Sequence, residues 1–504
     1  MQVNKNILRT ILVCSYTCII AFILFGIGST YSYLNTGANR ESILHTHVKK
    51  ETPYTPKTTW DTLNLEGRPI DLQTLKRIKK DYLNAWYIKH LSNKTNNTYG
   101  INDYYTKHAR KNIIKTIKHQ QKQNIYIDET TLEHHINIDF FSEDGQLAVL
   151  TDRDVIDYKH IYQNNKIILK TQSKATYKVI LLLEDGFWRI RHLIKEKQTS
   201  HNPTYLPALN TIKSIKGINY YPQSSPWDMF GDTFNKNIIQ KDFKIIKNAG
   251  LNSIRIFIPY QDFGAAHVKP EKLSKLKQIL DIANAENLGI VITLFDFYGN
   301  YSITNWTLNR QHASSIVSAI KNHDALLAWD IKNEPNLDFK SRNKETVLAW
   351  LENMIFLIKS LDNKHPVTIG WSNVLSTKLL NNKVDFVSFH YYDDINLLEQ
   401  KYKSIKKEIT NKPIVLTEFG MSTYKGFWNP FGNSEKDQKL YYKKAQEVFN
   451  KNSINFMSWT LYDYYKIPKE VVGRLPWKKQ TQGKYGLINH NRETKPAFKY
   501  ISSM

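Results

Sequence analysis

Two glutamates of this sequence stand at the ends of apolar runs and have the chemistry needed to cleave a glycosidic bond. Glu334 follows the run Leu326–Asp330, and Glu418 closes the run Ile414–Glu418. A carboxylate at the exit of a buried strand projects from a rigid rim. Two carboxylates on either side of a glycosidic bond are the usual requirement for its cleavage. The chemistry therefore depends on a scaffold that brings the ends of the two runs together.

From about residue 210 onward, short apolar runs alternate with amphipathic stretches. The runs predict eight strands: Ile215–Tyr220, Ser253–Ile258, Gly289–Phe295, Leu326–Asp330, Val367–Gly370, Phe386–His390, Ile414–Glu418 and Asn455–Trp459. The stretches between them predict helices: Asn237–Asn248, Glu271–Glu286, Gln311–Lys321, Glu345–Leu361, Asn396–Ile409, Glu435–Phe449 and finally Lys495–Ser503. This order, count and length predict an α/β fold of the (β/α)8 TIM-barrel type.

Polar and aromatic residues gather where these strands end, and the C-terminal strand ends carry the working residues of such a barrel. They are Arg255, Asn333, Glu334, His390, Tyr391, Tyr392, Glu418, Trp459 and Tyr462. Five further tryptophans fall in the predicted rim loops and are candidate sugar platforms: Trp227, Trp306, Trp371, Trp428 and Trp477. We also expect the insert Lys466–Lys484 to shape one end of the cleft.

Each of these residue types has a task in glycoside hydrolysis with retention of configuration. One carboxylate must be ionised to attack the anomeric carbon, and a nearby arginine favours that form. The other must first be protonated and then act as a base, so its surroundings must raise its pKa. A neighbouring asparagine can bind the sugar 2-hydroxyl, and aromatic faces offer sugars an apolar platform.

At these positions the sequence resembles the clan A glycoside hydrolases, most closely glycoside hydrolase family 5, the cellulase and mannanase family. Asn333-Glu334-Pro335 resembles the family's strand-four motif, which implies that Glu334 is the acid/base. Leu416-Thr417-Glu418-Phe419-Gly420 resembles the strand-seven motif, which implies that Glu418 is the nucleophile. The resemblance covers residues 210–504.

The same resemblance assigns substrate-binding and supporting residues. Arg255 matches the arginine of strand two, His390-Tyr391-Tyr392 matches the His-x-Tyr after strand six, and Trp459 matches the tryptophan of strand eight. It implies that Arg255 and Tyr392 support Glu418, that Asn333 binds the 2-hydroxyl, and that Trp459 lies under the sugar.

Two stretches depart from the family 5 pattern. Many members have a histidine near the end of strand three, whereas this chain has Phe295-Asp296-Phe297-Tyr298. The opening Gly217–Pro222 also resembles the barrel of glycoside hydrolase family 2. These departures leave the substrate subsite and the subfamily open.

An α+β domain is predicted ahead of the barrel. Its helical patterns run from Leu72 to Trp86 and over Lys107–Gln121. The strands that follow are His135–Phe141, Leu147–Tyr158, Lys166–Lys170, Thr176–Leu183 and Trp188–Ile194. This order resembles the cone-shaped nuclear-transport-factor-2-like (NTF2-like) superfamily, which implies a spacer or docking module. His134 and His135 point to opposite faces of a strand, so they predict no metal site.

The N-terminus predicts export. Residues 10–39 are uncharged and strongly apolar over Ile11–Ile27, and Lys5 and Arg9 precede them. We expect an uncleaved signal anchor; a signal cleaved near the weak match at Gly26–Ser29 is the alternative. The predicted parts are a cytoplasmic tip (1–9), a transmembrane signal anchor (10–34), a linker (35–67), an α+β NTF2-like domain (68–205) and the TIM barrel (206–504).

Composition narrows the class of partner. The net charge of +24 is diffuse and Lys-rich, which fits a solvated surface or attraction to anionic lipid or an acidic glycan. Zinc-finger spacing, RNP-type motifs and phosphate-binding glycine loops are all missing, so we expect no nucleic acid partner. The two cysteines, Cys14 and Cys18, lie in the apolar run and predict neither a disulfide nor a cysteine metal site.

The sequence thus favours a membrane-anchored retaining glycosidase that cleaves β-glycosidic bonds of a polysaccharide or oligosaccharide outside the cytoplasm. We expect it to need no metal and no organic cofactor. A transglycosylase with the same site and a non-catalytic glycan-binding barrel are the alternatives. The sugar, the linkage, endo or exo attack and the oligomeric state stay open.

Overall fold

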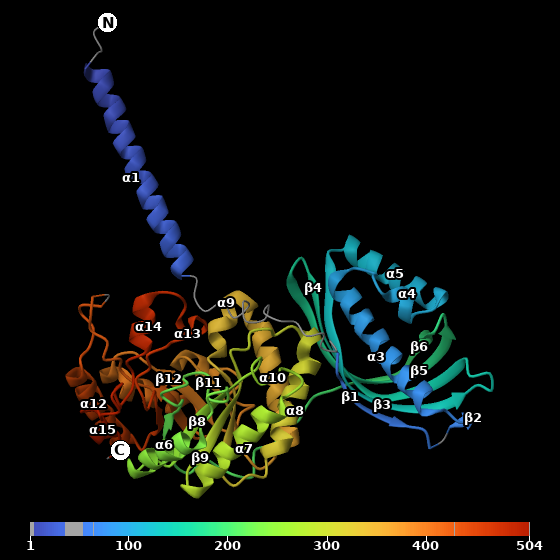
Figure 1. Ribbon diagram of the computed structural model, residues 1–504. Coiled ribbons are helices and arrows are strands. Elements are labelled where there is room, and N and C mark those ends of the chain that lie inside the picture. The colour runs from blue at the N-terminus through green and yellow to red at the C-terminus, as the bar shows by residue number, and fades with distance from the viewer. Residues whose placement is uncertain (1–4, 36–53, 64, 428, 503–504) are drawn as a thin grey trace.

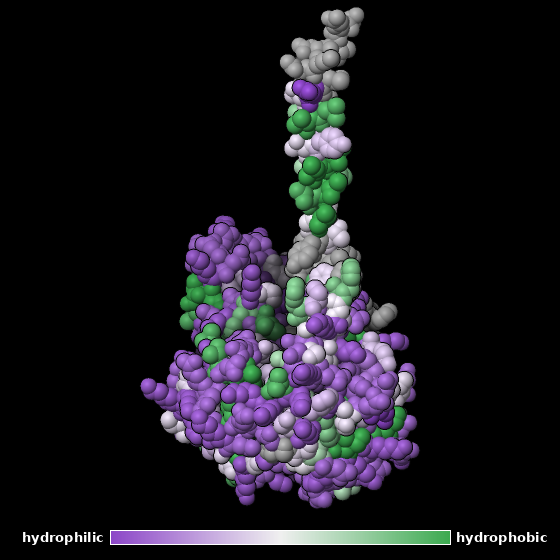
Figure 2. Space-filling model, turned by 90° about the vertical axis from the view of Figure 1, so that its left-hand side faces the viewer, coloured by the Kyte–Doolittle hydropathy of each residue, from purple (hydrophilic) through white to green (hydrophobic). Residues whose placement is uncertain are grey.

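The computed structural model describes residues 5–35, 54–63, 65–427 and 429–502. Along the chain, an apolar helix α1 (Lys5–Asn35) is followed by an α+β domain and a closed barrel (Figure 1). Figure 2 shows α1 as a mainly apolar column that stands away from a largely hydrophilic body. Its stretch Leu12–Thr30 is long and apolar enough to cross a membrane, a test that signal sequences also pass. Residues 1–4 of the predicted tip lie outside the described residues.

A curved sheet covered by helices forms the α+β domain. The helices are α3 (Leu72–Thr95), α4 (Ile101–Tyr104) and α5 (Lys107–Lys122). The antiparallel ladder consists of β3 (Ile125–Phe141), β4 (Leu147–Gln163), β5 (Lys166–Glu184) and β6 (Phe187–Ser200). Helix α3 begins where the Asp71 carboxylate accepts a hydrogen bond from the Thr74 amide at 2.9 Å. The NTF2-like resemblance of this domain stays a prediction.

Three sequence predictions for this domain are wrong in their boundaries: the linker, the strand β5 and the start of β3. The sequence predicts a linker over residues 35–67, but within it β1 (Lys57–Asp61) and β2 (Glu66–Gly67) pair in parallel with β3. Trp60 explains the β1 pairing, because its ring packs edge-on against buried Tyr82 at 6.0 Å. Residues 36–53 and 64 of the predicted linker lie outside the described residues.

The predicted strands Lys166–Lys170 and Thr176–Leu183 are one strand, β5, and the predicted strand His135–Phe141 begins earlier, at Ile125. Because the residues between the two predicted halves of β5 are polar, the sequence does not indicate that the strand is continuous. Their backbone groups pair with β4 on one side, and from Ser173 onward with β6 on the other, so the ladder does not need apolar side chains there.

The barrel closes in the order β10-β11-β12-β13-β14-β7-β8-β9, with every neighbouring pair parallel. Its strands are β7 (Lys216–Asn219), β8 (Ser253–Pro259), β9 (Gly289–Asp296), β10 (Leu326–Asn333), β11 (Val367–Trp371), β12 (Val387–Tyr391), β13 (Ile414–Phe419) and β14 (Asn455–Ser458). All eight lie where the sequence predicted strands, so the TIM-barrel prediction is confirmed.

The outer layer of the barrel is helical. It contains α6 (Lys236–Asn248), α7 (Pro270–Ala285), α8 (Trp306–Ile320), α10 (Lys344–Leu361), α11 (Leu398–Glu408) and α12 (Glu435–Asn452). Shorter turns join them: η1 (Ile303–Asn305), η2 (Pro335–Asp338), α9 (Phe339–Arg342), η3 (Val374–Lys378), η4 (Ile395–Leu397), α13 (Lys469–Val472), α14 (Pro476–Gln482) and α15 (Phe498–Ile501).

The last helix is shorter than predicted from Lys495–Ser503. Lys495 lies before α15, where its amide donates to the Leu487 carbonyl at 2.8 Å. Its ammonium is buried against Asp463 at 2.7 Å. These two bonds tie Lys495 to the barrel, and the chain then turns at Pro496 and Ala497 before α15 begins.

The α+β domain packs on the outside of the barrel, against α8 and α10 (Figure 1). Tyr158 of β4 stacks on Trp306 with ring centroids 4.4 Å apart, and Leu132 of β3 joins the hydrophobic core of the barrel. Beside them, Arg310 and Glu133 form a partly buried ion pair at 3.0 Å. Trp306 is therefore a buried interface residue, and its prediction as a sugar platform is wrong.

Candidate active site

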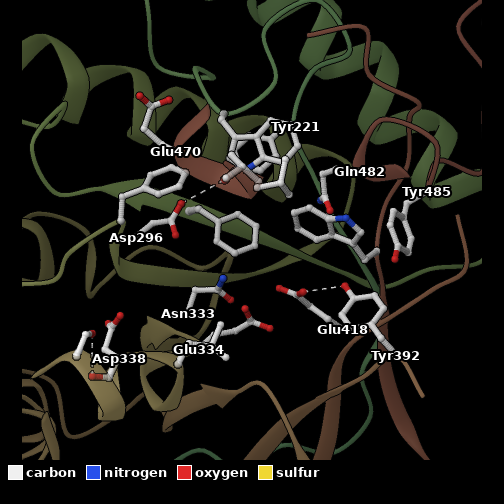
Figure 3. Close-up of a pocket in the computed structure, with 18 residues that line it drawn as sticks. Tyr221, Asp296, Asn333, Glu334, Asp338, Tyr392, Glu418, Glu470, Gln482 and Tyr485 are labelled. Carbon is white, nitrogen blue, oxygen red and sulfur yellow. Dashed lines mark hydrogen bonds between the residues drawn. The ribbon is translucent and has the colours of Figure 1, made fainter. Parts of the chain in front are cut away.

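A cavity of about 520 Å³ opens at the C-terminal ends of the barrel strands (Figure 3). Its size lies in the range of roughly 300–1,000 Å³ that is usual for ligand pockets. The lining residues are Tyr221, Trp227, Phe257, Asp296, Phe297, Asn333, Glu334, Leu337, Asp338, Ser341, Tyr392, Glu418, Trp459, Glu470, Val471, Val472, Gln482 and Tyr485. Five of the seven predicted site residues are among them. Of the other two, Arg255 contacts Glu418, and His390 contacts both glutamates.

Glu334 and Glu418 face the same cavity from β10 and β13 (Figure 3). His390 lies between them, with Nδ1 2.8 Å from Oε1 of Glu334 and 3.5 Å from Oε2 of Glu418. One oxygen of each carboxylate and a ring nitrogen of His390 all lie within 4.8 Å of one another. The two glutamates, which are far apart in sequence, thus form one pair.

Both oxygens of Glu418 receive a hydrogen bond. Arg255 Nη1 donates to Oε1 at 2.5 Å, and the Tyr392 hydroxyl donates to Oε2 at 2.9 Å. The Glu418 side chain is 6% exposed and that of Arg255 is fully buried. A carboxylate held on both oxygens has a fixed orientation, and its remaining lone pairs are available to the cavity.

Arg255 is the centre of a buried network that fixes the floor of the site. Its Nε and Nη2 donate to Asp330 Oδ2 at 3.0 and 2.6 Å, and Nη2 also donates to Asn333 Oδ1 at 2.9 Å. Burial alone lowers the pKa of Arg255, but the facing carboxylates of Asp330 and Glu418 outweigh it and raise the pKa above its usual value. The guanidinium therefore stays charged.

Three residues of this floor were not predicted from the sequence: Thr293, Asp330 and Gly370. Asp330 accepts hydrogen bonds from Arg255, from the Thr293 hydroxyl and from the Gly370 amide. A β-carbon on Gly370 would lie 2.9 Å from Arg255 Nη2 and 3.2 Å from His390 Nε2, so only glycine fits without displacement. The signals were present, because a charge within an apolar strand and a glycine within a strand both suggest a special role.

Backbone strain also gathers at this cavity. Glu334 has φ 48° and ψ 47°, and Trp227 and Phe297 have φ 60° and 56°. Left-handed conformations of non-glycine residues cost on the order of 1–3 kcal/mol each and cluster at functional sites. The Glu334 amide donates to the Gly370 carbonyl at 2.7 Å, which holds the strained turn in place. The sequence does not indicate that these three residues adopt left-handed conformations.

Aromatic rings form one wall of the cavity. Trp459 lies with its ring centroid 6.0 Å from Phe257, 6.2 Å from Trp227 and 6.5 Å from Tyr221. Tyr485 packs edge-on against Tyr392 at 5.7 Å. This wall offers the apolar surface that was expected of Trp459 and Trp227.

The other aromatic candidates are not part of that wall. Trp371 is buried, and Trp477 of α14 is not among the lining residues. Trp428 lies outside the described residues. The hydroxyls of Tyr391 and Tyr462 bind Asp394 and Asp242, not the glutamate pair. The insert Lys466–Lys484 does reach the cavity, through Glu470, Val471, Val472 and Gln482.

Glu334, His390 and Glu418 are close enough together to be considered as metal ligands. Their surroundings fit a metal poorly, because Arg255 places a positive charge on Oε1 of Glu418 and Tyr392 occupies Oε2. The arrangement fits acid/base and nucleophilic chemistry by the side chains themselves.

Comparison with known proteins points in the same direction. A family model described as cellulase (glycosyl hydrolase family 5) matches residues 212–464. The β-glucuronidase of Chlorocebus aethiops is 24% identical over 300 residues, 56% of this chain and 42% of that protein. Mannan endo-1,4-β-mannosidase 5 of Arabidopsis thaliana is 24% identical over 259 residues, 42% of this chain and 56% of that protein. The chain thus spans about half the length of these two relatives.

Two solved structures are similar to the chain at low identity. GH5_18 from Streptomyces cattleya in complex with GlcNAc aligns with a TM-score of 0.47 and 14% identity, covering 57% of this chain and 78% of that one. The β-D-glucuronidase of Dictyoglomus thermophilum aligns with a TM-score of 0.44 and 17% identity, covering 75% and 67%.

Proposed function

The chain belongs to glycosyl hydrolase family 5 and is a glycosidase, and on this premise we propose that it cleaves β-glycosidic bonds of a polysaccharide with retention of configuration. One observation carries the proposal: oxygens of Glu334 and Glu418 lie within 4.8 Å of each other. Retaining enzymes place their two carboxyl groups about 5–5.5 Å apart, whereas inverting enzymes need roughly 6.5–9.5 Å to admit a water molecule.

In the first step, Glu418 attacks the anomeric carbon and the bond from that carbon to the leaving oxygen breaks. Glu334 gives its proton to the leaving oxygen, so the departing sugar leaves as a neutral alcohol. Arg255 and Tyr392 orient Glu418 for this attack by donating hydrogen bonds to its two oxygens. The product is a covalent glycosyl-enzyme on Glu418.

In the second step, Glu334 acts as a base. It takes a proton from water, the hydroxide oxygen bonds to the anomeric carbon, and the bond to Glu418 breaks. His390 Nδ1 lies 2.8 Å from Glu334 Oε1 and holds that carboxyl group in place. A second inversion at the same carbon restores the original configuration.

Asn333 and the aromatic wall hold the sugar during both steps. Because Arg255 can only donate, Asn333 must present its carbonyl oxygen to Arg255. Its amide NH₂ is then left to donate to the sugar 2-hydroxyl, a contact that strengthens in the transition state. Trp459 supplies the apolar face on which the ring rests.

We further propose that α1 anchors the enzyme in a membrane and that the barrel acts outside the cytoplasm. The apolar stretch Leu12–Thr30 with Arg9 before it supports this orientation. Secretion after cleavage of the same segment is the alternative.

Proton NMR during cleavage of aryl β-glycosides tests the proposal, because the first anomer released shows the stereochemistry. We expect the β-anomer first, and loss of turnover in Glu418→Ala. The exposed carboxylate variant Glu447→Gln on α12 is the control and keeps wild-type activity. An α-anomer as first product, or an unchanged rate in Glu418→Ala, would contradict the proposal. Products longer than the substrate would indicate glycosyl transfer by the same site.

A further inference from the structure

A second cavity, which we call the interdomain cavity, lies between the α+β domain and the barrel. Its volume is about 510 Å³, close to that of the active-site cavity, and among the described residues the two cavities share no lining side chain. Its walls come from β4, β5, residues 201–205 of the link between the domains, α10 and Lys383. The size falls in the usual range for ligand pockets, so the lining decides which ligand fits.

The interdomain cavity lies on the same flank of the barrel as part of the active-site cavity. Leu337 of η2 and Ser341 of α9 line the active-site cavity, and the chain then enters α10 at Lys344 (Figure 1). Glu352 and Phe356 of α10 line the interdomain cavity. At 1.5 Å per residue, Glu352 lies about 12 Å along the helix from Lys344. A polymer is long enough to reach both cavities.

Aromatic rings give the interdomain cavity an apolar surface. Phe356 is half-buried, and the rings of His201 and Tyr205 stand nearly perpendicular to it, each with its centroid 6.2 Å away. Tyr158 of β4 also lines the cavity. One face of a pyranose ring consists of C–H groups, and an aromatic side chain that covers this face removes apolar surface from water.

Amide side chains add hydrogen-bonding groups to these rings. Asn353 is 7% exposed, and its Oδ1 accepts from Arg310 Nη1 at 3.4 Å, so its NH₂ group points to other acceptors. The side chain of Gln172 also lines the cavity and makes no hydrogen bond to the described residues. Buried amides are almost always hydrogen-bonded. The lining therefore favours a ligand with hydroxyl groups over a hydrocarbon chain.

The charged side chains of the lining are paired with opposite charges. Lys383 lies 3.0 Å from Glu352, and Lys170 lies 2.5 Å from Glu345. Burial lowers the pKa of His201, so its imidazole is neutral at pH 7. These pairs leave no net charge, so the cavity favours a neutral ligand over a phosphate or a uronic acid.

A peptide strand fits poorly, because the nearest strand edge is already occupied. Gln172 pairs with Tyr158 of β4 on one side of β5. On the other side, the Gln172 carbonyl accepts from the His201 amide at 3.0 Å, and from Ser173 onward β5 pairs with β6. A partner strand would need a free edge.

We propose that the interdomain cavity is a second carbohydrate-binding site, which holds a neutral sugar unit of the polysaccharide that the active site cleaves. The rings cover the apolar face of the sugar, and Asn353 and Gln172 bind its hydroxyls. The site binds without cleaving, because Glu352 is the only carboxylate among its described lining residues and is held by Tyr205 and Lys383. Only the choice of a polysaccharide as ligand rests on the proposed function. Two binding places on one chain raise the affinity for a polymer.

Calorimetric titration of the full chain in detergent tests the proposal. The probes are neutral β-glucan, β-mannan and β-xylan trisaccharides, and the protein carries Glu418→Ala so that they stay intact. We expect two molecules of at least one probe per chain, and one when Phe356→Ala or Gln172→Ala is added. Gln172→Ala removes no hydrogen bond to the described residues, so it keeps the fold. A single site for every probe, or no binding, would overturn the proposal.

Kinetics of the chain with Glu418 intact gives a second readout. Phe356→Ala and Gln172→Ala should raise KM for the neutral polymer about tenfold, and change kcat/KM less than twofold for an aryl β-glycoside, which occupies only the active site. Phe356→Tyr keeps the ring and should keep both rates. Tyr99→Ala is the control, because that ring is 88% exposed and lines neither cavity.

Further outcomes separate this inference from the proposed function. Equal losses for the polymer and the aryl glycoside would mean that the substitutions act through the fold, and they would overturn the inference. Tighter binding of uronic-acid trisaccharides than of neutral ones would overturn it as well. If an activated fluoro-glycoside never labels Glu418, the proposed function fails, whereas the binding measured in Glu418→Ala is unaffected.

Discussion

Gly370 of β11 offers a sensitive test of how the floor of the site positions the nucleophile. In Gly370→Ala, the new β-carbon would lie 2.9 Å from Arg255 Nη2 and 3.2 Å from both Asp330 Oδ2 and His390 Nε2. The backbone of Gly370 does not have a positive φ, so alanine brings no backbone strain. The new methyl group therefore displaces the Arg255 guanidinium, which must move by several tenths of an ångström.

That displacement should reach the reaction through Glu418. Arg255 donates to Glu418 at 2.5 Å, so a shift of the guanidinium misorients the carboxylate. Misplacement by about 1 Å costs on the order of 10²-fold in rate, and overpacking costs about 1–3 kcal/mol of stability. We expect kcat to fall roughly 10- to 100-fold with little change in KM. Steady-state kinetics and thermal unfolding measure the two effects.

Gly289→Ala provides the matched control. Its β-carbon would also meet a neighbour at 3.2 Å, but that neighbour is Leu327, at the opposite end of the barrel strands from the site. It should lower the stability and leave kcat unchanged. If Gly370→Ala keeps wild-type kcat, or if both variants lose kcat equally, the reasoning about the Arg255 floor is wrong.

Three further predictions follow from single contacts. Tyr392→Phe removes a hydrogen bond to charged Glu418, worth about 1.5–3 kcal/mol, so kcat should fall about 10- to 100-fold; an unchanged kcat would refute the role of this hydroxyl. Burial lowers the pKa of His90 to about 3 and that of His160 to about 4, so below pH 6.5 the unfolded chain binds protons that the folded chain does not. The free energy of unfolding should therefore fall by about 4 kcal/mol from pH 7 to pH 5 in urea titrations, and a flat profile would contradict it. Arg310→Ala leaves the half-buried Glu133 with only the exposed Lys57, 3.6 Å away, as its cation partner, so thermal unfolding should show a loss of about 1.5–3 kcal/mol; Lys378→Ala at an exposed pair should lose under about 1 kcal/mol.

The barrel was predictable because its signals are local. Buried parallel strands such as β13 are continuous apolar runs, and the helices between them carry an apolar stripe. Five of the seven site residues line the cavity because the C-terminal ends of parallel strands meet at one rim. Arg255 and His390 contact the glutamates but do not line the cavity themselves. A position near the end of a strand does not by itself tell a lining residue from a supporting one.

The features that could not be predicted from the sequence depend on contacts between residues that are far apart along the chain. The polar middle of β5 pairs through its backbone, and β1 is a strand only because β3 lies beside it. The left-handed turn at Glu334 exists because Gly370 and its neighbours hold it, and Trp306 is buried because a second domain covers it. None of these contacts leaves a periodic pattern in the chain.

The most direct test of the central claim is covalent trapping of the nucleophile. An activated 2-deoxy-2-fluoro β-glycoside that is accepted as substrate should inactivate the enzyme and add one sugar to the peptide that contains Glu418, as seen by mass spectrometry. The Glu418→Ala variant should take up no label. A sugar found on any other residue, or turnover of that substrate without a trapped intermediate, would contradict double displacement by Glu418 and Glu334.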